Sequence, residues 1–234
     1  MEPIFVYGFP SGTSMGLVAA FELIGRPYRL CRVDMLKDMK NDSYSLINAR
    51  QETPALVTDE GNVLTETMAI LHWLERWDSG RRVTFDPASA EADRMYQFAA
   101  FLNTGFTGAF SPLWVAFELE DGDPAYLEAL RRFGRDSVAE RHAKLEAMMP
   151  EDGFLIGDRI TLADTTLVGV ARWAEFHEAV DVNDFPRLAA LRRRVEAQPA
   201  VKFAEAIEAG DVPVGSGAFL GHVALEEVID RFGA

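Results

Sequence analysis

The sequence contains a single cysteine, Cys31, among its 234 residues. One thiol cannot form a disulfide within the chain, and it cannot supply a cysteine-based zinc site. Histidine is also scarce, and no two histidines stand three or four positions apart as a metal-binding pair on a helix would. The four are His72, His142, His177 and His222. We therefore expect no metal centre, and 48% hydrophobic residues provide enough apolar material for a core without one.

The sequence also lacks the features of a secreted or membrane-spanning chain. It begins Met1-Glu2-Pro3 without basic residues, and its first apolar run is broken at Gly8 and Pro10, which does not fit a signal peptide. No stretch approaches the roughly 18 apolar residues that a membrane span needs. Because a lone thiol suits a reducing compartment, we expect a cytoplasmic protein with no membrane partner.

Basic residues are in the minority, with 23 Lys and Arg against 37 Asp and Glu and a formal net charge of −14. Such a chain repels nucleic acid unless it carries a local basic stripe. The densest basic cluster is 192–194, next to Glu196, which is typical of a solvated helix face. We expect no nucleic-acid partner.

The first eighty residues alternate between strand and helix patterns. Short β-branched and aromatic runs predict strands at 4–7, 28–33, 55–57 and 63–64. Apolar residues at helical spacing predict helices at 14–24, 38–48 and 66–77, of which the second is weak. Gly25 is a suitable stop for the first helix, and Asp-Glu-Gly-Asn between the last two strands is hairpin turn chemistry. This βαβαββα order predicts a small α/β domain over residues 1–79.

The rest of the chain has the rhythm of helices only. A polar stretch with breakers over 80–88 is the expected linker, and 89–234 is the expected all-helical domain. Residues 162–179 are apolar on nearly every side, which predicts a helix at the centre of a bundle. A final helix is expected over 219–232, after a flexible segment at 213–217.

Thr53-Pro54 stands just before the third predicted strand. Proline cannot donate to a strand ladder, so it is tolerated at a strand's first residue, and an X-Pro bond is one of the few that can be cis. A cis bond here turns the backbone N–H and C=O of Thr53 toward a ligand. A peptide-like ligand could then pair with Thr53 as an additional strand.

Glu66 and Thr67 stand at the start of the third predicted helix. Unpaired N–H groups and the positive end of the helix dipole gather at such a terminus. With the Thr67 hydroxyl they form a carboxylate site, and Glu66 accepts from an ammonium group. The pair therefore fits the head group of an amino acid, although an ordinary helix cap would use the same residue types.

The turn Pro-Ser-Gly-Thr-Ser at 10–14 joins the first strand to the first helix. A thiol bound beside this turn could be held as a thiolate by a hydroxyl donor and the helix dipole. The alternative is that Thr13 or Ser14 is simply the helix cap.

In this order the segments resemble the N-terminal domain of the glutathione S-transferase family: strand, turn at 10–14, Thr53-Pro54, then Glu66-Thr67. The second half adds two similarities. Residues 156–164 resemble the family's motif before its central helix, with Thr161 and Asp164 as a capping box. Residues 101–114 resemble the first long helix of bacterial members. The similarity extends to about residue 208.

The resemblance implies a thioredoxin-like domain that binds glutathione and an all-helical domain that shapes the pocket for a second, mostly apolar substrate. Glutathione is the implied co-substrate, and its thiolate would attack an electrophile. The γ-glutamyl end would meet Glu66 and Thr67, and the cysteinyl backbone would pair at Thr53 and Pro54. The resemblance also implies a homodimer.

The resemblance carries four candidates for the group that activates the thiol. Counting back from Gly25, Ser11 matches the active serine of the zeta- and tau-like classes, and Ser14 matches a hydroxyl frequent in bacterial members. Thr13 stands where bacterial relatives often have cysteine. Tyr7 roughly matches the tyrosine of the tyrosine-type classes, although it also fits an ordinary strand aromatic. We rank them Ser11, Ser14, Thr13 and Tyr7.

The resemblance places the acceptor between this turn and a helical wall at Phe106, Phe110 and Trp114. A histidine frequent in the family is Thr107 here, and a frequent glutamate is Gly105. These differences predict a pocket with less charge and an altered substrate.

Three alternatives belong to other classes or reactions. Residues 12–16 fit the Gly-x-Ser-x-Gly elbow of a hydrolase, with His177 or His222 as base, but the elbow would follow the very first strand with no sheet built before it. A non-enzymatic binding or regulatory protein could use the same fold, and residues 48–53 depart from the family's usual pattern. Within the enzyme class, isomerisation, ether cleavage and dehalogenation all use the same activated thiolate.

Overall fold

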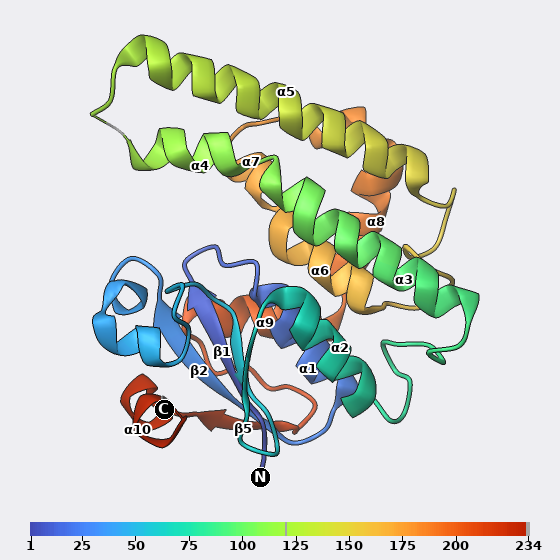
Figure 1. Cartoon of the computed structure of the whole chain (residues 1–234). Coiled ribbons are helices and arrows are strands. Elements are labelled where there is room, and N and C mark those ends of the chain that lie inside the picture. The colour runs from blue at the N-terminus through green and yellow to red at the C-terminus, as the bar shows by residue number, and fades with distance from the viewer. Residues whose placement is uncertain (120, 233–234) are drawn as a thin grey trace.

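A computed structural model describes residues 1–119 and 121–232 of the chain, which form a sheet-containing layer and a helical layer (Figure 1). The strands are β1 (Ile4–Phe9), β2 (Tyr28–Asp34), β3 (Ala55–Val57), β4 (Val63–Thr65) and β5 (Phe219–His222). The helices are α1 (Met15–Ile24), α2 (Thr67–Trp77), α3 (Ala90–Ala100), α4 (Ser111–Glu118), α5 (Pro124–Met148), α6 (Leu162–Ala171), α7 (Trp173–Phe176), α8 (Pro186–Glu196), α9 (Pro199–Ala209) and α10 (Leu225–Phe232).

The sheet is mixed and has the order β4-β3-β1-β2-β5. β1 pairs with β2 in parallel and with β3 antiparallel, and β3 pairs with β4 as the predicted hairpin. β1 reads as a continuous apolar run because both of its faces are buried. Gly25 ends α1 with φ of 67°, as its sequence position predicts. The predicted fold class is confirmed.

The weak helix predicted over 38–48 is absent as an α-helix. Two short 3₁₀ segments, Asp38–Lys40 and Asp42–Leu46, take its place. Polar side chains there bond to the local backbone, as the Ser45 hydroxyl does by donating to the Asp42 carbonyl at 2.5 Å, and such bonds compete with a regular helix. The sheet face on this side is completed by α10, whose Val228 is fully buried against the strands.

The final helix predicted over 219–232 is wrong in its first part, because residues 219–222 form β5. This strand lies parallel to β2 and extends the sheet, and only residues 225–232 form α10. The edge of β2 is thereby paired: the Tyr28 N–H donates to the Ala218 carbonyl at 3.0 Å, and the Val223 N–H donates to the Leu30 carbonyl at 2.8 Å. Residues 219–232 therefore pack on the sheet (Figure 1).

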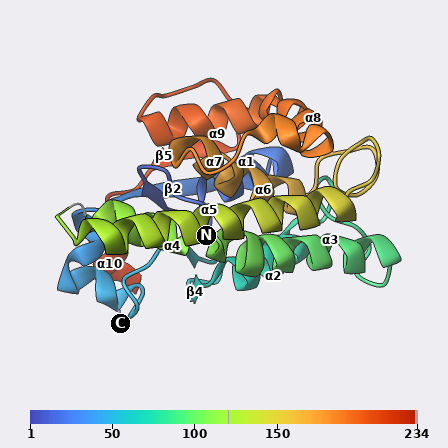
Figure 2. The same cartoon turned by 90° about the horizontal axis from the view of Figure 1, so that it is seen from above.

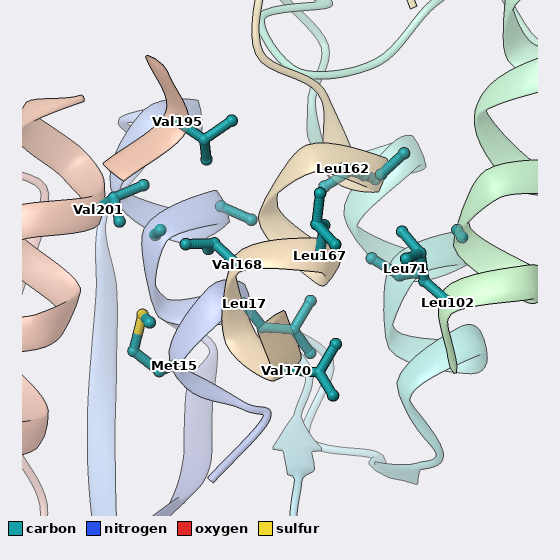
Figure 3. Close-up of a cluster of buried hydrophobic side chains, with 14 of the residues drawn as sticks. Met15, Leu17, Leu71, Leu102, Leu162, Leu167, Val168, Val170, Val195 and Val201 are labelled. Carbon is teal, nitrogen blue, oxygen red and sulfur yellow. The ribbon is translucent and has the colours of Figure 1, made fainter. Parts of the chain in front are cut away.

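The central helix α6 is buried along its whole length, which the all-round apolar pattern predicts. Seen from above, it lies between α8 and α9 on one side and α3 to α5 on the other (Figure 2). Leu162, Leu167, Val168 and Val170 of α6 pack among side chains from the neighbouring helices (Figure 3). The helix stops earlier than predicted, at Ala171, and the chain turns into the short α7.

The predicted capping box at the start of α6 is present. The Thr161 N–H and hydroxyl donate to Asp164 Oδ2 at 2.8 and 2.7 Å, and the Leu155 N–H donates to Oδ1 at 2.9 Å. These bonds fix the N-terminus of α6. The predicted linker at 80–88 is also bonded, since Asp78 accepts from the N–H groups of Arg82 and Val83.

α1 and α6 touch through their backbones. A Cβ at Gly16 would lie 1.9 Å from the Thr165 carbonyl oxygen, and a Cβ at Gly169 would lie 2.2 Å from the Thr13 carbonyl oxygen. Only glycine fits at both positions, so the two helices approach closely at the point where the first turn enters α1.

We expect Gly16→Ala to lower the free energy of unfolding by about 3 kcal/mol, because the added methyl group meets backbone that cannot move aside. Denaturant unfolding measures this loss. Gly108→Ala is the matched control, since a Cβ there meets nothing within 4 Å. Equal stability of the two variants would show that the close approach of α1 and α6 is not a constraint.

Candidate active site

The predicted binding residues meet at one end of three neighbouring strands, where β3 begins and β1 and β4 end. Ala55 of β3 pairs with Val6 of β1 on one side and with Thr65 of β4 on the other. The next residues along each strand are therefore neighbours: Thr53-Pro54 before β3, Glu66-Thr67 after β4, and the end of β1 with its turn. A Cβ at Gly8 would lie 2.4 Å from Thr53 Oγ1, so the first turn and Thr53 are in direct proximity.

The Thr53–Pro54 bond is cis, as the sequence allowed. The segment before it is held by two side chains that the sequence did not single out for this role. The Tyr44 hydroxyl and the Asn48 amide both donate to the Glu52 carbonyl, at 2.9 and 2.8 Å. These bonds fix the backbone that leads into Thr53 although the segment departs from the family's usual pattern.

Glu66 occupies the residue before α2 with φ of 73°, and Thr67 opens the helix. The Glu66 carboxylate forms an ion pair with Arg50, which also pairs with Glu52 at 2.9 Å. More than half of the Glu66 side chain is exposed. An ammonium group that arrives at Glu66 therefore meets a carboxylate that already has a cationic neighbour.

The hydroxyls of the first turn differ in their surroundings. Ser14 is 2% exposed, and its Oγ accepts from the Gly8 N–H at 3.0 Å, which ties the turn to the end of β1. Ser11 follows a cis Phe9–Pro10 bond, has φ of 56° and is half-buried, as is Thr13. Ser14 is therefore part of the turn's internal structure, whereas Ser11 and Thr13 reach its surface.

The Tyr7 hydroxyl does not point toward the turn at 10–14 but bonds to α9. The ring is fully buried, and the hydroxyl donates to the Ile207 carbonyl of α9 at 3.3 Å and lies 3.2 Å from His222 Nε2. Burial raises the pKa of Tyr7 far above its ordinary value, and Arg32 offsets this only in part. The Tyr7 hydroxyl stays protonated and engaged beneath α9.

The predicted helical wall is only partly at the surface. Phe106 and Phe110 are fully buried and pack around His142, with ring centroids 4.6 and 6.3 Å from it. Trp114 is half-buried and meets the rings of Trp173 and Phe176 at 5.1 and 5.2 Å. Phe106 lies in a π-helical segment, Phe101–Phe106, that interrupts the long helix.

Trp173 and Phe176 of α7, which the sequence analysis did not assign to the wall, and the following His177 complete it. The indole N–H of Trp173 donates to the Ser11 carbonyl at 2.9 Å, so Trp173 joins the wall to the first turn. His177 lies 4.4 Å from Trp114 between ring centroids. Phe117, Phe176 and His177 also border a cavity of about 210 Å³ between α4, α5 and α7. The rings of α7 follow the helix break at Arg172, and the apolar pattern of the sequence does not reveal this break.

Two features are absent from the described ranges, 1–119 and 121–232. No cluster of three or more His, Cys, Asp or Glu side chains suited to a metal ion occurs there. No helix in that part of the chain combines the length and the apolar character needed to cross a membrane.

Sequence models of the two domains of the glutathione S-transferase family match the chain, the N-terminal domain over residues 11–77 and the C-terminal domain over 110–199. Glutathione S-transferase GstA of Escherichia coli O157:H7 is 24% identical over 204 residues, 85% of this chain and 96% of that protein. A maleylacetoacetate isomerase of Pseudomonas aeruginosa is 27% identical over 220 residues, 88% and 96% of the two chains. The structure of a glutathione transferase from Methylococcus capsulatus is 28% identical and has a TM-score of 0.73, covering 88% of this chain and 98% of that one.

The mixed sheet with a cis-proline just before β3, followed by a helical domain, defines a thioredoxin-like protein with an attached helical bundle. The two matched domains identify its family: the chain belongs to the glutathione S-transferase family. The resemblance seen in the sequence is confirmed. The hydrolase alternative is not supported, because Ser14 of the Gly-x-Ser-x-Gly segment bonds to Gly8 and no histidine contact to it is found among the described residues.

The buried His142 makes stability depend on pH. Its Nδ1 lies 2.8 Å from the Val138 carbonyl, and burial lowers its pKa from 6.5 to about 4. The unfolded chain binds a proton between these values and the folded chain does not, so stability is lost as pH falls from 6.5 towards 4, by about 3 kcal/mol. We expect His142→Phe to flatten this part of the curve of unfolding free energy against pH. An unchanged slope in His142→Phe would show that other groups carry the dependence.

Proposed function

We propose that this protein is a glutathione transferase that binds glutathione where β3 begins and β1 and β4 end, and that it activates the glutathione thiol for attack on a small, mostly apolar electrophile. The observation that carries this proposal is the meeting of three elements at Ala55: the cis Thr53–Pro54 bond, the start of α2 at Glu66-Thr67, and the turn after β1. The family assignment and the relatives named as glutathione transferases support it.

In the proposed complex the peptide backbone of glutathione pairs with Thr53 as a short additional strand. The γ-glutamyl carboxylate meets the Thr67 hydroxyl and the N–H groups of α2, and its ammonium group meets Glu66. Arg50 shares Glu66 with the ammonium group, so the three charges form a compact cluster at the rim. This anchors the peptide and leaves its sulfur beside the first turn.

Ser11 is the hydroxyl that we assign to the sulfur, because it is half-exposed at the turn while Ser14 is buried and bonded to Gly8. Its O–H donates to the thiolate, and the N-terminus of α1 adds a favourable field. Both effects lower the pKa of the bound thiol, whose proton leaves to solvent. The thiolate then forms a carbon–sulfur bond with the electrophile, and the leaving group departs with its electron pair.

The aromatic wall suggests the class of acceptor. Trp173 touches Ser11 through its indole N–H, and Trp114 and Phe176 extend from it as a continuous aromatic surface. A planar aromatic or unsaturated acceptor would stack on these rings beside the sulfur. The relative named maleylacetoacetate isomerase favours isomerisation of an unsaturated compound as the second candidate activity, since it would use the same thiolate.

We also propose that the protein acts as a cytoplasmic, metal-free homodimer, as the family resemblance implies. Cys31 is fully buried, and burial raises the pKa of its thiol to about 12. It is therefore an unreactive core residue, and the thiol chemistry belongs to the co-substrate.

Calorimetric titration with reduced glutathione tests the binding site directly. The wild-type protein should bind one glutathione per chain, and the double variant Glu66→Gln, Thr67→Val should weaken binding by about 3 kcal/mol, because two hydrogen bonds to charged groups are lost. Glu60→Gln, an exposed acid in the β3–β4 turn, is the matched control. Absence of binding by folded wild-type protein up to millimolar glutathione would favour a non-enzymatic binding protein of the same fold.

Single substitutions separate the roles of the two serines. Ser11→Ala should raise the pKa of the bound thiol by about one unit with little change in stability. Ser14→Ala should instead lower the free energy of unfolding by about 1–3 kcal/mol, because it leaves the Gly8 N–H without its acceptor. The thiolate absorbance of bound glutathione and denaturant unfolding measure the two effects. A raised thiol pKa in Ser14→Ala alone would transfer the assignment to Ser14.

A further inference from the structure

The helical domain holds the first turn by both backbone groups of one residue. The Gly12 N–H donates to Glu208 Oε1 of α9 at 3.1 Å, and the Gly12 carbonyl accepts from Arg172 Nη2 at 2.8 Å. Arg172 stands at the break between α6 and α7. The Trp173 indole adds a third bond, to the neighbouring Ser11 carbonyl.

Arg172 and Glu208 also bind each other at two points. Arg172 Nη2 lies 2.8 Å from Glu208 Oε1, and Nη1 contacts Oε2. The side chains are 27% and 12% exposed, so solvent screens the pair less than it would an ion pair on the surface. A forked guanidinium matches a carboxylate in this way and still leaves a donor for the Gly12 carbonyl.

Glu208 is itself fixed from the sheet side. Arg32 of β2 donates from Nη2 to the Glu208 carbonyl at 2.9 Å, near the C-terminal end of α9, where a cation is favoured. The guanidinium of Arg32 also lies 3.3 Å above the ring of Phe9. The pair is therefore anchored to the same sheet that carries the glutathione site.

Gly12 transmits any displacement to the rest of the turn. A Cβ at Gly12 would lie 2.3 Å from the Gly8 carbonyl oxygen and 3.1 Å from Ser14 Oγ, so the turn closes on itself at this residue. Ser11 and Thr13, the two half-exposed hydroxyl residues, flank it directly. A shift of Gly12 would change where these hydroxyls stand.

We propose that Arg172 and Glu208 form a positioning pair that fixes the Ser11 hydroxyl against the sulfur of bound glutathione and balances the charge beside it. The inference rests on the proposed glutathione site. The pair places one positive and one negative charge next to the turn, so that neither dominates and the thiolate depends on the hydroxyl and the N-terminus of α1. Removing one of the two charges leaves the other without its balancing partner beside the turn.

Substitutions that remove one charge at a time give opposite results. Arg172→Met leaves the Glu208 carboxylate unbalanced and should raise the pKa of bound glutathione by about one unit, while Glu208→Gln leaves Arg172 and Arg32 and should lower it by a similar amount. The double variant should return the thiol pKa close to the wild-type value, yet its turnover should fall about 10- to 100-fold because the turn has lost its bonds. Thiolate absorbance against pH and steady-state kinetics measure these effects.

Arg187→Met is the matched control, because Arg187 pairs with Glu146 between α8 and α5 and is not bonded to the turn. It should leave the thiol pKa unchanged. A purely structural role for Arg172 and Glu208 would move the thiol pKa in the same direction in both single variants, or in neither, and that result would overturn the inference. Arg172→Lys, which keeps the charge but not the fork, should retain the thiol pKa and lose turnover.

Amide hydrogen exchange in the ligand-free protein separates this inference from the proposed function. The Gly12 amide should exchange at least tenfold faster in Glu208→Gln than in the wild-type protein, because its acceptor is weakened. Faster exchange in a protein that does not bind glutathione would retain the hold on the turn and reject its role at a sulfur. Unchanged exchange in the ligand-free variant, together with normal binding of glutathione in a separate titration, would reject the positioning pair and leave the proposed function standing.

Discussion

The arrangement of the active site depends on a contact that contains no side chains: the backbone approach of α1 to α6 at Gly16 and Gly169. Because helices held by backbone contact cannot slide or rotate without a clash, the beginning of α1 has one position relative to the middle of α6. Thr13, whose carbonyl lies against Gly169, is in the turn that we assign to the thiol. The packing of two helices therefore sets the place of the chemistry.

α6 links its own N-terminal cap to the residues that bond to the turn at 10–14. The capping box of α6 fixes the N-terminal end of this helix. Its surface is buried on every side, and the helix ends just before Arg172. From Asp164 at the cap to Gly169 at the contact and Arg172 at the break, the helix rises about 1.5 Å per residue. The donors of Arg172 and Trp173 thus reach the turn because the helix begins and ends where it does.

The parts of the fold that the sequence predicts are those determined locally. The hairpin, the capping box of Thr161 and Asp164, and the stop at Gly25 each depend on a few adjacent residues. The break at Arg172 does not, since no proline or glycine stands between Arg172 and Ala179 to mark it. β5 was also missed because its partner, β2, lies at the other end of the chain and supplies the bonds that make Phe219 extended. The helical spacing of Phe106 and Phe110 identifies an apolar face, but it does not distinguish a ligand pocket from the packing around His142.

The candidate site likewise has one part that is determined by nearby residues and another that depends on residues far away in the sequence. The residues proposed to bind the peptide lie in or beside a hairpin, so they come from one short region of the sequence: Thr53, Pro54, Glu66 and Thr67. The position of Ser11 depends instead on Arg172, Trp173 and Glu208, which come from helices far away in the sequence. In the proposed complex, changes in the helical domain would therefore alter the reaction at sulfur and the choice of acceptor without disturbing the anchoring of glutathione. A family that keeps one co-substrate while it diversifies its reactions would benefit from this separation, and the contacts around Gly12 give it a physical basis in this chain.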